Sequence, residues 1–136
     1  MNKDRAPIIS VDFILCGENE NPEFDKITCE LGIVPDYAKR REERKCPQLA
    51  KHEWGLSVSR DSSYAVQDVF TELLKKIEQK EQCINRVQQE LNLQAVFVVV
   101  VVIYKDRPEI VLSPQIVSFA GSIHAEISID IYYGDE

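Results

Sequence analysis

The sequence predicts a single α+β domain in which a mixed or antiparallel sheet packs with one long and two short helices. Three observations lead to this fold class. The length of 136 residues favours one domain over the whole range 1–136. The apolar fraction of 44% and the charged fraction of 29% are typical of a globular protein with a buried core. Segments with period-two alternation occur between segments of helical period, which predicts both strands and helices.

The first strand is expected over Ile8–Cys16, because its side chains alternate between two faces. One face is apolar and carries Val11, Phe13 and Leu15. The opposite face is more polar and consists of Ser10, Asp12, Ile14 and Cys16.

A short helix is predicted from Pro22 or Glu23 to Leu31, because apolar residues recur there at helical spacing. Gly32 stands just past the last of them, where a glycine commonly ends a helix. Residues 36–50 are rich in charge, which favours an exposed loop.

The next strand is predicted over Glu53–Ser59. Trp54, Leu56 and Val58 occupy alternate positions, and the residues between them are small. One face of this strand is therefore strongly apolar, and the other consists of small groups.

A long amphipathic helix follows and extends to Leu91, with Ser62 or Ser63 as its expected cap. Its apolar stripe thins between Ile77 and Ile84, so a kink and two separate helices are both open alternatives there.

Residues 95–104 are expected to form the central strand. Five consecutive valines favour a strand over a helix, because branched side chains are stiff at χ1. The nearly continuous apolar character predicts that both faces of this strand are covered. The segment is too short to span a bilayer as a helix.

The C-terminal part is predicted to contain a short strand at Glu109–Leu112, a helix and a last strand at Ala125–Tyr133. Ser113 is expected to cap that helix, with Pro114 at its first position. Residues 9–14 and 127–132 share an apolar-Ser-apolar-Asp-apolar pattern, which suggests a pseudo-repeat of two strand-helix-strand halves. Alternation alone also produces much of that similarity.

Polar residues of several strands fall opposite the apolar faces, and they would gather on one side if the strands share a sheet. This surface is the predicted binding site, and a plain solvated sheet face is the alternative. The candidate binding residues are Asp12, Ser57, Glu126, Ser128, Asp130 and Tyr132.

The net charge of −7 argues against a nucleic-acid partner, because phosphate contacts require clustered Lys and Arg. The one basic run, at residues 39–45, is interrupted by Glu42 and Glu43. An acidic protein can instead bind a basic protein through complementary charge. The N-terminus lacks the apolar segment of a signal peptide, so a cytoplasmic location without membrane contact is expected.

No metal, cofactor or catalytic residue is predicted. The four cysteines include no C-x-x-C pair, so free thiols in a reducing compartment are favoured over a site built from Cys29, Cys46 and His52. There are two histidines and no nucleophile or phosphate-binding motif. Acid–base chemistry would need Asp12, Asp130 and a glutamate such as Glu126 to approach one another.

Two segments carry a resemblance to a known family. They are the Ile-Thr-x-x-Leu-Gly-Ile-x-Pro stretch at Ile27–Pro35 and the Ile-Asp-Ile-Tyr stretch at Ile129–Tyr132. Further matching positions are Cys16–Gly17, Asn21–Pro22, Trp54 and Leu112–Ser113. Over nearly its whole length the chain resembles the bacterial domain-of-unknown-function family DUF4279. Because members of that family are similar in size and acidity to immunity proteins, the resemblance implies a binding role.

The expected function is therefore a protein-binding module, such as an immunity protein that neutralises a basic toxin by direct binding. One alternative is a small-ligand sensor with a pocket beneath Trp54 and Tyr132. An enzyme that uses Asp and Glu residues is the less favoured alternative. The sequence does not predict an oligomeric state.

Overall fold

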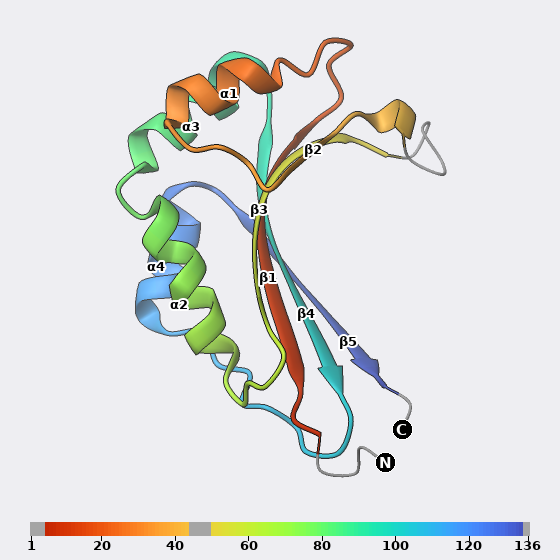
Figure 1. Cartoon of the computed structure of the whole chain (residues 1–136). Helices are drawn as coiled ribbons and strands as arrows, with labels where there is room; N and C mark the ends of the chain where they lie inside the picture. The colour runs from red at the N-terminus through yellow and green to blue at the C-terminus, as the bar shows by residue number, and fades with distance from the viewer. Residues whose placement is uncertain (1–4, 44–49, 135–136) are drawn as a thin grey trace.

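The computed structural model describes residues 5–43 and 50–134, which fold into two layers (Figure 1). One layer is a five-stranded sheet, and all four helices lie on the same side of it. The strands are β1 (Ile8–Gly17), β2 (Tyr37–Lys39), β3 (His52–Arg60), β4 (Gln94–Ile103) and β5 (Glu126–Tyr133). The helices are α1 (Phe24–Leu31), α2 (Val66–Ile77), α3 (Glu81–Leu91) and α4 (Pro114–Ser122). The predicted α+β fold class with a mixed sheet is confirmed.

The strand order is β2-β3-β1-β4-β5. The first strand of the chain lies in the centre and pairs antiparallel with both β3 and β4. The last strand, β5, pairs parallel with β4, because α4 carries the chain back to the start of the sheet. The suggested pseudo-repeat is not reflected in this topology, since β1 pairs antiparallel with β3 whereas β4 pairs parallel with β5.

The long predicted helix is two helices. α2 ends at Ile77 and α3 begins at Glu81, where the apolar stripe is interrupted by polar residues. The predicted serine cap is wrong, because the N-cap of α2 is Ala65, which makes no side-chain cap. A backbone carbonyl does this work instead: the Val66 N–H donates to the Glu109 carbonyl at 3.0 Å. The strand predicted at residues 109–112 is reduced to an isolated bridge between Ala65 and Glu109.

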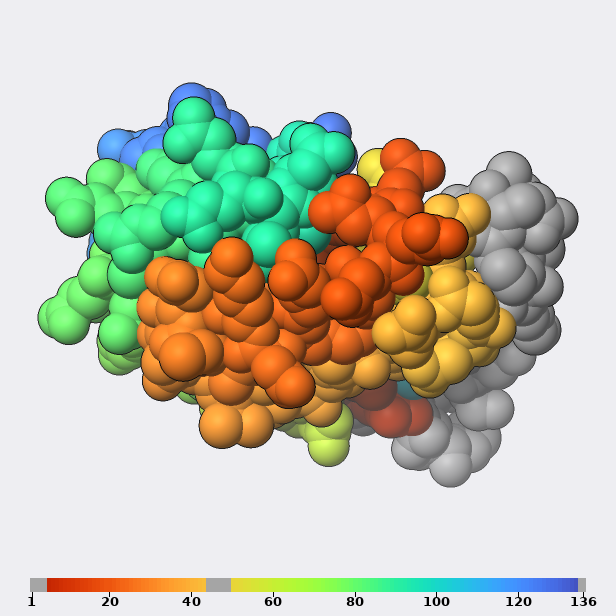
Figure 2. All heavy atoms as spheres, turned by 90° about the horizontal axis from the view of Figure 1, so that it is seen from above, coloured from red at the N-terminus to blue at the C-terminus, as the bar shows by residue number. Residues whose placement is uncertain are grey.

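Two other helix boundaries agree with the prediction. Gly32 ends α1 with a φ of 68°, a left-handed conformation that a residue without Cβ adopts at little cost. Ser113 caps α4, and its Oγ accepts a hydrogen bond from the Ile116 N–H at 3.3 Å. Figure 2 shows α1 and α3 side by side at the upper end of the molecule, where an ion pair of 3.4 Å joins Glu30 and Arg86.

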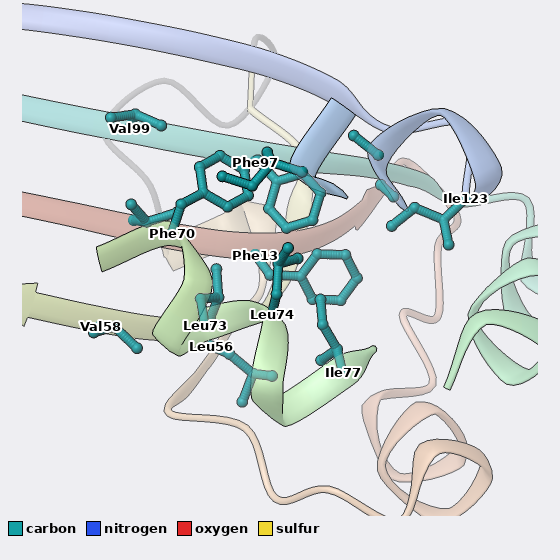
Figure 3. Close-up of a cluster of buried hydrophobic side chains, with 14 of the residues drawn as sticks. Phe13, Leu56, Val58, Phe70, Leu73, Leu74, Ile77, Phe97, Val99 and Ile123 are labelled. Atoms are coloured by element: carbon teal, nitrogen blue, oxygen red, sulfur yellow. The ribbon is translucent and has the colours of Figure 1, made fainter. Parts of the chain in front are cut away.

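The core fills the space between the helices and one face of the sheet (Figure 3). Three rings form its centre: Phe97 packs against Phe13 and Phe70, with centroid distances of 5.3 and 4.9 Å. Trp54 is fully buried at the next strand, and its Nε1–H donates to Thr28 Oγ1 at 3.0 Å. This contact fixes α1 above β3.

Residues 95–104 were predicted to form the central strand with both faces covered, and both parts of this prediction are wrong, because β4 lies next to the edge strand β5 and one of its faces is open. Val99 and Val101 are fully buried in the core, whereas Val98 and Val100 are partly exposed. The reason is that every described helix packs on one side of the sheet. A run of valines therefore marks strand propensity here and not burial on two faces.

The segment predicted as a loop at residues 36–50 contains β2 and a short 3-10 helix at Arg41–Glu43. A three-residue strand is too short to show an alternating pattern, so the sequence gives no sign of it. Cys46 lies outside the described residues. None of the described helices has the length and apolar character needed to cross a membrane.

Candidate functional site

The side of the sheet away from the helices, which we call the open face, brings the predicted binding residues together. Sheet register sets Ser57, Asp12, Val98 and Ser128 side by side across β3, β1, β4 and β5. Asp130 pairs with Val100 one row further along. All six predicted residues lie on this face: Asp12, Ser57, Glu126, Ser128, Asp130 and Tyr132.

Asp12 accepts two side-chain hydrogen bonds on the open face. Its Oδ1 accepts a hydrogen bond from Ser57 Oγ at 2.6 Å, and its Oδ2 accepts one from the Tyr37 hydroxyl at 2.8 Å. The neighbouring Asp36 carboxylate accepts the Ser57 N–H at 2.8 Å. These bonds tie β2 to the middle of the sheet, so Asp12 has a structural role.

Tyr37 was missed by sequence reasoning. It pairs with Gly55 on β3, and its ring crosses that residue to reach Asp12 on the strand beyond. A Cβ on Gly55 would lie 2.2 Å from the Tyr37 Cζ, so only glycine leaves room for the ring. The glycine between Trp54 and Leu56 was a signal of such a close approach.

A stripe of valines divides the open face. Val96, Val98, Val100 and Val102 project from β4 between the polar residues of β1 and those of β5. All four are partly exposed. The predicted polar surface is therefore two polar columns separated by an apolar one, because β4 lies between the two strands that carry the aspartates.

The second polar column, on β5, is open to solvent. Glu126, Ser128 and Asp130 are exposed, and Tyr132 is 57% exposed. Asp130 and Asp12 thus differ in environment, although their sequence contexts match. Asp12 is held by two hydrogen bonds, whereas Asp130 stands exposed at the outer strand.

Asp12 and Asp130 do not approach each other on the open face. Asp12 and Asp130 stand on strands separated by β4, so their backbones are about 10 Å apart or more. Among the described residues, no group of three His, Cys, Asp or Glu side chains is placed to hold a metal ion.

The pocket suggested beneath Trp54 and Tyr132 does not exist, because these residues lie on opposite faces of the sheet. Trp54 is buried on the helix side, and Tyr132 is exposed on the open face. A cavity on the helix side, lined by Leu15, Phe24 and His52 among others, measures about 10 Å³. That volume suits about one water molecule and excludes an organic ligand.

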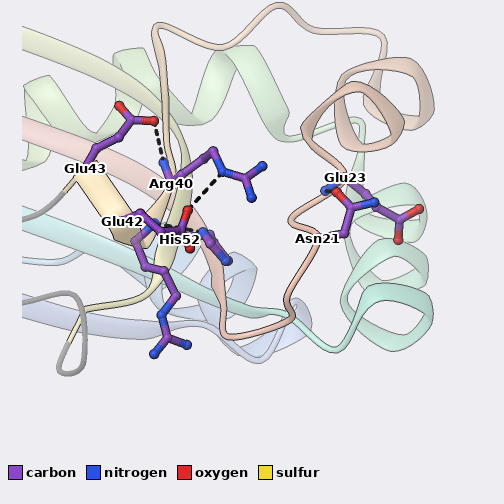
Figure 4. Close-up of polar contacts among 7 residues, drawn as sticks. Asn21, Glu23, Arg40, Glu42, Glu43 and His52 are labelled. Atoms are coloured by element: carbon purple, nitrogen blue, oxygen red, sulfur yellow. Dashed lines mark hydrogen bonds and ion pairs between the residues drawn. The ribbon is translucent and has the colours of Figure 1, made fainter.

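His52 is 3% exposed, and its Nδ1 accepts a hydrogen bond from the Arg41 N–H at 2.8 Å (Figure 4). Its ring packs edge-on against Phe24, with centroids 6.4 Å apart. Close by, Arg40 Nε donates to Glu42 at 3.0 Å, and this hydrogen bond lowers the pKa of the Glu42 carboxyl. The Arg41–His52 hydrogen bond thus joins the segment after β2 to β3, and the Phe24 ring contact joins α1 to the same strand.

Cys16, Cys29 and Cys83 are free thiols in the structure. Burial raises the pKa of the Cys16 thiol, and its Sγ donates to the Gln94 carbonyl at 3.4 Å. The acidic neighbour Glu53 raises this pKa further, whereas Lys51 lowers it. Cys16 is therefore a protonated, packed side chain at neutral pH.

Comparison with known proteins gives one match. The model of a family described as a domain of unknown function (DUF4279) matches residues 7–134. No curated protein and no solved structure matches the chain.

Proposed function

Because the chain belongs to the DUF4279 family, as the sequence resemblance predicted, we propose from the geometry of the sheet that it is a protein-binding module whose open face docks a partner protein. The single observation behind this proposal is that, within residues 5–43 and 50–134, no helix lies over one whole face of the five-stranded sheet. Sheets of this size with helices on one side leave the other side to solvent or to a partner.

The composition of the open face supports a protein partner. The partly exposed valine stripe of β4 is flanked on one side by the polar residues of β1 and β3, and on the other by the carboxylates, hydroxyl and phenol of β5. An apolar centre with a polar margin is the usual anatomy of a protein interface, and tyrosine is enriched there. A sheet face of this kind offers area to a protein and no enclosure to a small molecule.

The charge of the chain supports a basic partner. The net charge is −7, and Glu126 and Asp130 project from the most exposed strand of the face. Complementary charge raises association rates and rejects partners of the wrong sign. An immunity protein that covers the active site of a basic toxin is the specific form of this function that we propose.

Site-specific photo-cross-linking tests the location of the interface. A photoreactive residue placed at Val100 is expected to capture a partner in the native cell, and one placed at Glu78 on the helix side serves as the control. The captured protein is then purified and titrated against the chain. Capture from Glu78 with none from Val100 would contradict the proposal.

Charge reversal tests the chemistry of the interface. Asp130→Lys is expected to weaken binding of the purified partner about tenfold or more, whereas Glu78→Lys makes the same change of charge away from the open face and leaves affinity unchanged. The immunity form is tested by co-expression with the product of a neighbouring gene. That product is expected to arrest growth alone and to be neutralised by the wild-type chain but less by Asp130→Lys.

A further inference from the structure

The two edges of the sheet are protected to very different degrees. The edge at β2 is a strand of three residues that ends in Lys39 and is followed by Arg40 and Arg41. Short strands and positive charges are common devices against pairing with another chain. The edge at β5 has eight residues and contains no Lys, Arg, Pro or Gly. In the described part of the chain, no strand pairs with its outer side.

The outer side of β5 presents backbone groups next to exposed isoleucines. The Gly134 N–H, just after the strand, donates to the Ile103 carbonyl of β4 at 2.8 Å. Since successive residues of a strand direct their N–H groups to opposite sides, the N–H and C=O of Ile127, Ile129 and Ile131 point outward. The side chains of Ile129 and Ile131 are 40% and 46% exposed.

From this arrangement we infer that two copies of the chain associate through β5, in antiparallel pairing about a two-fold axis at Ile129. A two-fold interface uses the same surface of both copies, so the strand must be complementary to itself. In this register Ile129 lies opposite Ile129 of the second copy, and Ile127 lies opposite Ile131 of the second copy. Each such pair exchanges two N–H···O bonds, which gives about six bonds across the axis.

The charged residues of the strand select this register. Ser128 then faces Asp130 of the second copy, and Glu126 faces Tyr132, so no carboxylate is opposite another. A register shifted so that the two-fold axis passes at Asp130 would place Asp130 opposite Asp130 of the second copy. A register shifted so that the axis passes at Ser128 would place Glu126 opposite Asp130 of the second copy. Like charges directly opposite on a sheet are destabilising, so both shifted registers are disfavoured.

The resulting dimer would have one continuous sheet with the helices of both copies on the same side. This inference does not depend on the proposed function, and the two respond oppositely to salt. Two chains of charge −7 repel each other, so added salt strengthens the dimer by screening. Added salt instead weakens binding to a basic partner.

Sedimentation equilibrium of the purified chain tests association. The wild type is expected at twice the monomer mass of 15.6 kDa and Ile129→Lys at the monomer mass. Val117→Lys, which changes an exposed apolar residue of α4, is the matched control and stays dimeric. A wild type that remains monomeric at its highest soluble concentration overturns the inference. So does an Ile129→Lys protein that dimerises like the wild type.

Cysteine cross-linking tests the register independently of any loss of folding. Ile129→Cys is expected to form a disulfide between copies under mild oxidation, because residues paired across the axis lie within bonding reach. Ile131→Cys is the control. In this register residue 131 lies opposite Ile127 of the second copy, far from residue 131 of that copy. The linked peptide is identified by mass spectrometry. Efficient linking through residue 131 and none through residue 129 would refute the register.

Discussion

Replacing Asp12 by alanine is the sharpest test of how the open face is built. The substitution removes the acceptor of two hydrogen bonds, from Ser57 Oγ at 2.6 Å and from the Tyr37 hydroxyl at 2.8 Å. A hydrogen bond to a charged group contributes about 1.5–3 kcal/mol to stability. Because Asp12 is only partly buried, the lower end of that range applies to each bond, and we expect a loss of about 3 kcal/mol in all.

Urea denaturation followed by circular dichroism measures this loss. In thermal unfolding of a domain of this size, about 3 kcal/mol corresponds to a decrease in Tm of roughly 9–15 °C. Asp130→Ala is the matched control, because it removes the same side chain from an exposed position of the same face. Its expected effect is within about 0.5 kcal/mol. Equal effects of the two alanine variants would refute the structural role assigned to Asp12.

A double-mutant cycle separates the two hydrogen bonds. Tyr37→Phe removes only the hydroxyl and is expected to cost about 1.5 kcal/mol, the lower end of the range for a bond to a charged group. In the double variant the loss should be smaller than the sum of the single losses, because Asp12 and Tyr37 share one bond. Additive losses would show that the hydroxyl stabilises the fold through some other contact.

Three further predictions follow from burial and close approach. Val99→Asp places an unpaired charge in the core and is expected to give unfolded protein. Val100→Asp changes the open face and should remain soluble and folded by circular dichroism. Unfolding of both variants would mean that the open face is covered. Gly55→Ala should cost about 1–3 kcal/mol in urea denaturation, because its Cβ would collide with the tyrosine ring above it; an unchanged midpoint would contradict that ring position. The burial and raised pKa of Cys16 predict that iodoacetamide modifies the exposed Cys29 first. Alkylation of Cys16 in the native protein should increase only as the pH rises above the ordinary thiol pKa. Equal alkylation rates of Cys16 and Cys29 at neutral pH would show that Cys16 is not buried.

Much of the fold was predictable because single residues decide local structure. Gly32 and Ser113 set helix ends through backbone conformation and capping, which act within a few residues. The alternation of β1 and β3 assigned each side chain to a face, and the register confirms that Asp12 and Ser57 share one.

The remainder depended on contacts between distant segments. The Val66 N–H at the start of α2 donates to the carbonyl of Glu109. This partner is more than forty residues away in the sequence, so no local rule identifies it. The position of Tyr37 depends on a three-residue strand and on Gly55 of its neighbour. The open side of β4 was missed because the sequence shows how apolar a strand is and not where the helices will pack.

The central position of β1 has a consequence for how the chain acquires its structure. Residues 8–16 pair with residues 94–102, which are synthesised more than seventy residues later. Such distant pairing slows folding, because a long loop must close before the contact is gained. The nascent chain is therefore expected to leave β1 half-paired on the ribosome until β4 emerges. A chain that stops at residue 93 should remain unfolded by circular dichroism, and a native spectrum from it would show that β4 is dispensable for folding.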